Sequence, residues 1–171
     1  MQPGCIPALL CIAVPEKSSS PYQFGDLLAL ARRSWVREME KRLGRLGYDG
    51  YRRSDAAVLR LLWREPLAVG GLGALLGISR QAARKLVAAL EQRGYARTER
   101  DLADARRLNV LLTPRGEAYA RSITAVIDAL NSALASRVEP AQLAAADAVL
   151  RAAIVDDRER ARAAALVEPP R

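Results

Sequence analysis

Four side chains, each able to form several hydrogen bonds, lie near the start of one predicted helix. They are Arg80, Gln81, Arg84 and Lys85, and Ser79 precedes them. At about 100° per residue, Gln81, Arg84 and Lys85 share one face, with Arg80 at its N-terminal edge. A guanidinium can bind the N7 and O6 atoms of guanine, and an amide the N6 and N7 atoms of adenine. This face therefore has the chemistry to read base edges in a DNA groove.

The other side of this helix is apolar, which indicates that it is buried. Ala83, Leu86, Val87 and Leu90 share that side at three- and four-residue spacing. On the polar side, Ala88 is small enough to allow a partner to approach closely. An ordinary solvated helix has the same pattern, so this helix alone does not decide between the two interpretations.

The elements around this helix predict a winged helix-turn-helix. Residues 71–76 predict a short helix, and Gly77 and Ile78 a tight turn. Ser79 is an N-cap, because its hydroxyl can satisfy a free N–H of the first helical turn. The long helix then ends at Gly94. Two strands follow as a hairpin, over residues 95–100 and 108–112.

The tip of the hairpin, residues 101–107, is mostly polar and charged. Its paired arginines, Arg106 and Arg107, can enter a minor groove, where the negative potential attracts cations. Asp104 is close enough in the sequence to pair with either arginine and hold the shape of the tip. The alternative is a solvated loop with a local ion pair of little energy. A basic hairpin directly after the polar helix favours DNA contact by both elements.

The charge of the chain also favours an acidic partner. The 171 residues carry a net charge of +8. Residues 77–121 have a net charge of +5, whereas residues 122–171 have a net charge of −1. Nucleic acid is the partner that a basic middle segment fits best. The nearly neutral last third predicts a different task for that region.

Several kinds of catalytic site are excluded by residue type. The sequence has no histidine, so it has no imidazole base, no Ser-His or Cys-His pair and no zinc site that needs imidazole. It has no glycine-rich phosphate loop and no cluster with metal-ligand spacing. Asp156, Asp157 and Glu159 lie among arginines and predict a solvated patch. We therefore expect no enzyme activity, no cofactor and no metal.

Helices are predicted on both sides of the winged helix-turn-helix. Residues 23–46 have apolar side chains at helical spacing, and Ser54 is placed to cap a second helix. Thr113 and Pro114 open another helix that runs to about residue 138. Pro140 opens a last helix to about residue 166. One face of the earlier of these two helices is apolar: Ile123, Val126, Ile127, Leu130 and Leu134.

The first twenty residues differ in composition from the rest. They hold three prolines and a short apolar run, and no Lys or Arg precedes that run. A signal peptide needs a basic start, and a membrane span needs a longer apolar run. We expect residues 1–21 to be a disordered N-terminal extension, and the protein to be cytoplasmic.

Over residues 72–116 the sequence resembles the MarR family of bacterial winged-helix regulators. The matching stretches are LGALLGISRQAARKLVAALEQRGYA and RDLADARRLNVLLTPRG. The wing signature of the family appears as Asp104-Ala105-Arg106, followed by Leu112-Thr113-Pro114-Arg115-Gly116. The flanking helices agree in order and length, so the resemblance covers roughly residues 22–167. Ala82 and Ala83 depart from the family pattern, which often has hydroxyl residues there, and so offer fewer phosphate contacts.

The resemblance implies a mainly α fold, an α+β winged helix-turn-helix lobe plus a helical dimerisation lobe. It implies a homodimer, which the apolar stripe and low charge of the C-terminal helices also favour. The expected organisation is an N-terminal dimerisation helix over residues 22–52, a DNA-binding lobe over residues 53–113 and C-terminal dimerisation helices over residues 114–167.

The function implied is that of a dimeric transcriptional regulator, a repressor released by a small ligand. It would bind double-stranded DNA at a pseudo-palindromic operator, with Arg106 in the minor groove and Asp104 positioning it. The alternative is a winged-helix module that binds DNA non-specifically, or a protein partner, without reading an operator. The expected DNA-binding residues are Ser79, Arg80, Gln81, Arg84, Lys85, Asp104, Arg106 and Arg107.

Many relatives bind a small aromatic or anionic molecule between the dimer lobe and the winged lobe. Aromatic walls with an arginine would suit a phenolic carboxylate. The candidates are Trp35, Tyr48, Tyr51, Arg52, Arg53 and Trp63. The alternative is that Trp35 and Trp63 are core residues. Cys5 and Cys11 could act in redox sensing, but no adjacent cation lowers their thiol pKa.

Overall fold

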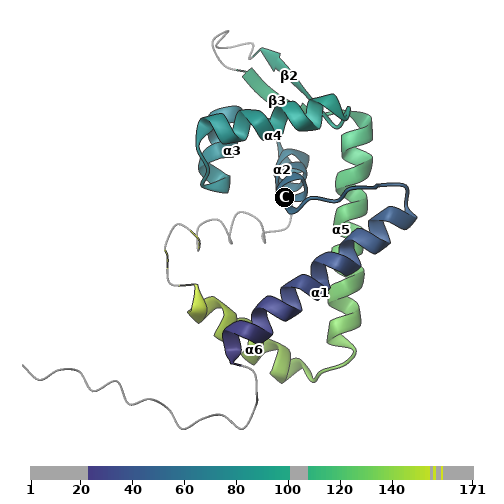
Figure 1. The fold of residues 1–171 in the computed structure, drawn as a ribbon, viewed down its shortest axis with the longest axis vertical. Coiled ribbons are helices and arrows are strands. Elements are labelled where there is room, and N and C mark those ends of the chain that lie inside the picture. Colours follow the sequence, from purple (N-terminus) through teal and green to yellow (C-terminus); the bar gives the residue numbers. More distant parts are fainter. Residues whose placement is uncertain (1–22, 101–107, 155, 157–158, 160–171) are drawn as a thin grey trace, which may run out of the picture. The chain divides into compact units, whose positions relative to one another are not determined.

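The computed structural model describes residues 23–100 and 108–154, together with Asp156 and Glu159. The chain divides within its first helix into two compact units, residues 1–35 and 36–171. The structure confirms a mainly α fold with one small sheet (Figure 1). The elements are α1 (Phe24–Arg45), α2 (Arg53–Arg64), β1 (Leu67–Ala68), α3 (Val69–Leu76), α4 (Arg80–Gln92), β2 (Ala96–Arg100), β3 (Leu108–Leu112), α5 (Pro114–Ala135) and α6 (Pro140–Ala153).

The buried residues of α1 lie in its second half. Met39 and Leu43 are buried, whereas Phe24, Leu27 and Leu28 near the start of the helix are exposed. Both groups follow the helical spacing that predicted this element. The first half of α1 therefore has an apolar surface that is exposed in a single chain.

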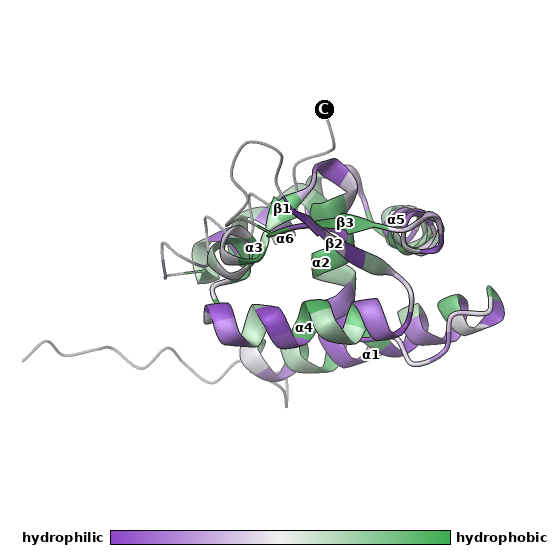
Figure 2. Ribbon diagram, turned by 90° about the horizontal axis from the view of Figure 1, so that it is seen from above, coloured by the Kyte–Doolittle hydropathy of each residue, from purple (hydrophilic) through white to green (hydrophobic). Residues whose placement is uncertain are grey.

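The winged helix has one hydrophobic core, to which α2, α3, α4, α5 and the sheet contribute. The sheet is antiparallel in the order β1-β3-β2, and Val110 of the central strand lies opposite Leu67 and Thr98. Figure 2 shows β3 as an apolar strand and β2 as a polar one. Burial of apolar surface is the main stabilising term for such a core. Its most deeply buried members include Val58, Leu59, Leu72, Leu90, Val110 and Ile123.

The turn between α3 and α4 depends on two small residues. Gly77 adopts a left-handed conformation, with φ of 56°, and ends α3. A Cβ atom on Gly73 would lie 3.2 Å from the carbonyl oxygen of Ile78 and 3.6 Å from the Cβ of Ala83. The two helices therefore approach closely only because position 73 lacks a side chain. This geometry confirms the predicted helix-turn-helix.

The start of α2 differs from the prediction. Ser54 was expected to cap this helix, but the N-cap is Arg52, which makes no side-chain capping bond. Ser54 lies inside the helix, and its Oγ donates to Oδ1 of Asp55 at 3.4 Å. The capping prediction was wrong because the helix begins earlier in the chain, with Asp55 rather than Ser54 facing the core.

The helix α5 is slightly shorter than predicted, and α6 ends before the predicted helix end near residue 166, most of whose last part lies outside the described residues. The helix α5 ends at Ala135, and α6 ends at Ala153, where Ile154 adopts an extended conformation. Much of the apolar stripe of α5 packs inside the chain itself, since Ile123, Val126 and Leu130 are buried. Neither these helices nor any other helix that the structure describes is long and apolar enough to cross a membrane.

Candidate nucleic-acid interface

The helix α4 presents the predicted polar residues on its exposed face. Arg80, Gln81, Arg84 and Lys85 are all exposed, and Ser79 before them is exposed as well. We call these five residues the α4 face. Figure 2 shows hydrophilic and apolar residues alternating along α4. On the apolar side Ala83, Val87 and Leu90 are buried and Leu86 is half-buried, as the helical wheel predicts.

The start of the α4 face is fixed by its cap. Oγ of Ser79 accepts a hydrogen bond from the backbone N–H of Ala82 at 3.1 Å. The Ser79 hydroxyl keeps its own proton for donation to an acceptor such as a phosphate oxygen. A capped helix start of this kind also favours a nearby anion through the helix dipole.

The far end of α4 is fixed by a buried ion pair. Nη2 of Arg93 lies 2.7 Å from Oδ2 of Asp55, a residue of α2 that is only 2% exposed. Nε of Arg93 donates to the carbonyl oxygen of Ala89 at 3.0 Å. The guanidinium therefore joins α4 to α2 and sets the position of the α4 face in the winged lobe.

Tyr95 extends this connection towards α5. The guanidinium carbon of Arg93 lies 5.5 Å from the centroid of the Tyr95 ring, and that of Arg115 lies 5.0 Å from it. The rings of Tyr95 and Tyr119 lie 4.9 Å apart, and Tyr119 stacks on Tyr48 at 4.4 Å. Burial raises the pKa of the Tyr119 hydroxyl. The sequence reasoning missed this group, because its members are far apart in the chain.

Contacts at the junction between the sheet and α5 explain why Thr113 and Gly116 occupy their positions in the LTPRG stretch. Oγ1 of Thr113 donates to the carbonyl oxygen of Gly94 at 2.6 Å and accepts from the N–H of Gly116 at 3.1 Å. The N–H of Thr113 donates to the carbonyl oxygen of Tyr95 at 3.1 Å. A Cβ atom on Gly116 would lie 1.8 Å from that same oxygen, so only glycine fits. The predicted cap at Thr113 is confirmed.

The wing adds further charge beside α4. On β2 the residues from Arg97 to Arg100 are exposed, and Arg97 forms an ion pair with Glu99. Asp104, Arg106 and Arg107 lie outside the described residues. Their expected roles in the minor groove stay predictions.

The six predicted ligand residues fall in different surroundings. Tyr48 stacks on Tyr119, and burial raises the pKa of the half-buried Tyr51. Arg52 and Arg53 are exposed at the start of α2, and Trp35 is a half-buried residue of the first unit. A ligand role for these five residues stays a prediction.

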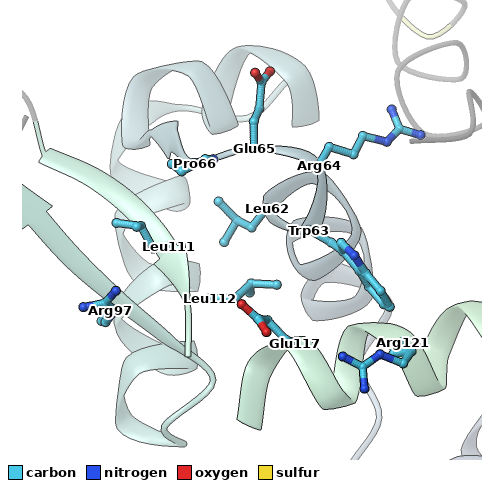
Figure 3. Close-up of a pocket in the computed structure, with 10 residues that line it drawn as sticks. All are labelled: Leu62, Trp63, Arg64, Glu65, Pro66, Arg97, Leu111, Leu112, Glu117 and Arg121. Carbon is cyan, nitrogen blue, oxygen red and sulfur yellow. The ribbon is translucent and has the colours of Figure 1, made fainter. Parts of the chain in front are cut away.

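Trp63, the sixth, lines a cavity of about 420 Å³ at the end of α2 (Figure 3). The cavity lies between this helix end, the sheet and the first turns of α5. The other lining residues are Leu62, Arg64, Glu65, Pro66, Arg97, Leu111, Leu112, Glu117 and Arg121. Of these ten lining residues, only Trp63 was among the predicted ligand residues, because the lining comes from separate elements. Within the described ranges no group of three or more Cys, Asp or Glu side chains could hold a metal ion.

Comparison with known proteins agrees with this geometry. Residues 49–107 match the model of the MarR family. The complex of Staphylococcus aureus MepR with DNA has a TM-score of 0.64 at 17% identity, over 75% of this chain and 94% of that chain. PcaV from Streptomyces coelicolor, in complex with its natural ligand, has a TM-score of 0.61 at 21% identity, over 77% and 91%. No curated protein matches the chain.

Proposed function

We propose that this chain is a transcriptional regulator of the MarR family, whose model residues 49–107 match, and a dimeric repressor that reads a pseudo-palindromic operator with the α4 face. The observation that carries the proposal is the exposed row of Arg80, Gln81, Arg84 and Lys85 on a capped helix. Recognition helices of helix-turn-helix proteins use their N-terminal residues in this way.

The proposed DNA contacts divide into two kinds. Gln81 and Arg84 read base edges in the major groove, because an amide and a guanidinium each form two hydrogen bonds with one base. Ser79, Arg80 and Lys85 bind phosphate or neighbouring base edges. In the wing, Arg106 and Arg107 enter the minor groove, and Asp104 positions Arg106.

The proposed dimer uses the helices outside the winged lobe. Exposed apolar side chains follow the end of α5 and run along α6: Leu134, Leu143, Val149 and Leu150. In α6 no residue is buried in the single chain, although most of its side chains are apolar or small. A second copy that covers these residues would remove them from water. Residues 22–52 and 114–167 are thus assigned to dimerisation, and residues 53–113 to DNA.

The proposed regulatory step is release of DNA when a small ligand binds. MepR has been solved with DNA and PcaV with a natural ligand, and both share the fold of this chain. A ligand that binds the free conformation better than the DNA-bound one would shift the protein off its operator. Such a regulator works in the cytoplasm, where the DNA is.

Footprinting of the DNA upstream of the gene tests the proposal. A dimer is expected to protect two half-sites whose centres lie about 10 base pairs apart, or a multiple of that spacing. The mass of the complex, from sedimentation, should equal one duplex and two chains. A single protected site bound by one chain would contradict the dimeric reading of an operator, and uniform protection of any duplex would favour a non-specific module.

A further inference from the structure

We propose that the cavity beside Trp63 binds a small zwitterion, an α-amino acid with an apolar side chain. The cavity has a volume of about 420 Å³, which lies in the range of small-molecule sites. It carries one acidic and one basic side chain from the same helix, next to an aromatic ring and a floor of leucines (Figure 3). Each of these parts matches one part of such a ligand.

The two charges are Glu117 and Arg121, which lie one turn apart on α5. An acid and a base at this spacing usually pair with each other. Here the guanidinium carbon of Arg121 instead lies 5.8 Å from the centroid of the Trp63 ring. The carboxylate of Glu117 forms no hydrogen bond or ion pair with any described residue. Both charges are therefore open to the opposite charges of a ligand.

The spacing of these two groups fits a carboxylate and an ammonium on one carbon atom. Side chains four residues apart on a helix have their Cβ atoms about 5–6 Å apart. A guanidinium that lies over an indole ring at this distance keeps its N–H groups for a bidentate bond to a carboxylate. The Glu117 carboxylate can accept hydrogen bonds from an ammonium beside it. An acid without an ammonium would leave Glu117 next to a second negative charge.

The apolar part of the ligand has its own surface in the cavity. Leu62 and Leu112 are buried, and Leu111 is half-buried. Trp63 forms a wall and is 36% exposed, so part of its ring can still be covered by a ligand. Covering apolar surface of this kind favours binding.

The other charged residues of the lining add little to the two charges that Glu117 and Arg121 offer a ligand. Arg97 is already paired with Glu99 on β2. In Figure 3 the side chains of Arg64 and Glu65 extend away from the centre of the view, in different directions. Glu117 and Arg121 are therefore the acid and the base that we assign to a molecule carrying both charges.

The position of the cavity allows a bound ligand to affect the wing. Arg97 and Leu111 face each other in the register of β2 and β3, and both line the cavity. These strands lead into the predicted minor-groove tip. An effect of the amino acid on DNA binding rests on the function proposed above, whereas binding in the cavity does not.

Tryptophan fluorescence tests the binding directly. The chain has two tryptophans, so Trp35→Phe leaves Trp63 as the single reporter. L-leucine, L-methionine and L-phenylalanine are titrated into this variant, alongside 4-methylpentanoate and 3-methylbutylamine, which each lack one charge of leucine. We expect saturable changes with at least one amino acid, and affinities at least about ten-fold weaker for the two analogues.

Variants of the two charged residues give the matched control. Glu117→Gln and Arg121→Gln should each weaken amino-acid binding at least about ten-fold, while Arg137→Gln, an exposed arginine beyond α5, should not. Equal or tighter binding of the acid or the amine would overturn the zwitterion assignment. No response to any of the three amino acids up to about 10 mM would overturn the site itself. DNA binding is measured separately, so failure of this site leaves the proposed regulator intact.

Discussion

The guanidinium of Arg93 and the carboxylate of Asp55 form a short ion pair, with 2.7 Å between Nη2 and Oδ2. Asp55 is almost wholly buried, whereas Arg93 is about one-third exposed. The pair joins the end of α4 to the start of α2, at the opposite end of α4 from Ser79. The helix α4 is therefore held at both ends, by a cap at Ser79 and by the ion pair of Arg93.

Arg93→Gln should destabilise the fold, because it leaves a buried carboxylate without its partner. We expect a loss of about 2 kcal/mol in the free energy of unfolding, measured in urea. The matched control is Arg151→Gln, which removes an i,i+4 pair with Asp147 that is exposed on both sides. Surface pairs contribute little, so this variant should unfold like the parent. Equal effects of the two substitutions would show that burial of Asp55 does not matter.

Gly116→Ala should damage the junction between the sheet and α5. The new Cβ atom would lie 1.8 Å from the carbonyl oxygen of Tyr95, which is backbone and cannot rotate away. We expect a lower melting temperature and a loss of more than about 2 kcal/mol. Gly71→Ala is the control, since it has open space around it in α3. That variant should be neutral, or more stable by up to about 1 kcal/mol.

Gln81→Ala and Arg84→Ala should relax the preference for particular base pairs. Each loss of a bidentate contact is expected to cost about 1–3 kcal/mol at one position, as measured by binding to a set of single-base operator variants. Arg106→Ala should instead weaken binding to all sequences about equally and lower the salt slope by about one unit. Arg137→Ala serves as the control. If the α4 variants bind every duplex like the parent, the assignment of the groove is wrong.

Leu150→Asp should weaken the dimer without unfolding the winged lobe. Leu150 is 42% exposed in the single chain, and the proposed second copy would cover it. We expect dissociation to start at higher protein concentrations in sedimentation, with unchanged melting of the winged helix. Leu130 would be a poor choice, because it is buried within the chain and its loss would unfold α5. A parent protein that is a stable monomer would contradict the dimer.

Local sequence signals predicted the helix-turn-helix well, because each part of it depends on neighbouring residues. The cap at Ser79, the turn at Gly77 and the alternation of buried and exposed positions on α4 all follow from spacings of a few residues. The strand over residues 108–112 was placed correctly for the same reason.

Contacts between distant residues could not be predicted in this way. Asp55 and Arg93 are 38 positions apart, and no local sequence pattern around either residue indicates that the two side chains form a pair. The need for glycine at position 116 arises from Tyr95, which belongs to another element. Likewise, Trp63 was predicted as a ligand residue from its aromatic ring. Its contact with Arg121 of α5 could not be predicted, because only folding brings the two residues together. The prediction at Ser54 was wrong because a serine, a residue type that often caps helices, is here the second residue of the helix, two positions after the N-cap Arg52.

Binding of the purified protein to the DNA upstream of its gene tests the central claim most directly. The comparison is with a shuffled duplex of the same length and composition, at about 50 and 200 mM salt, since non-specific contacts with phosphate weaken steeply over this range. An operator-reading regulator should keep a preference for the native duplex at the higher salt. Equal binding to both duplexes that is lost at the higher salt would contradict it.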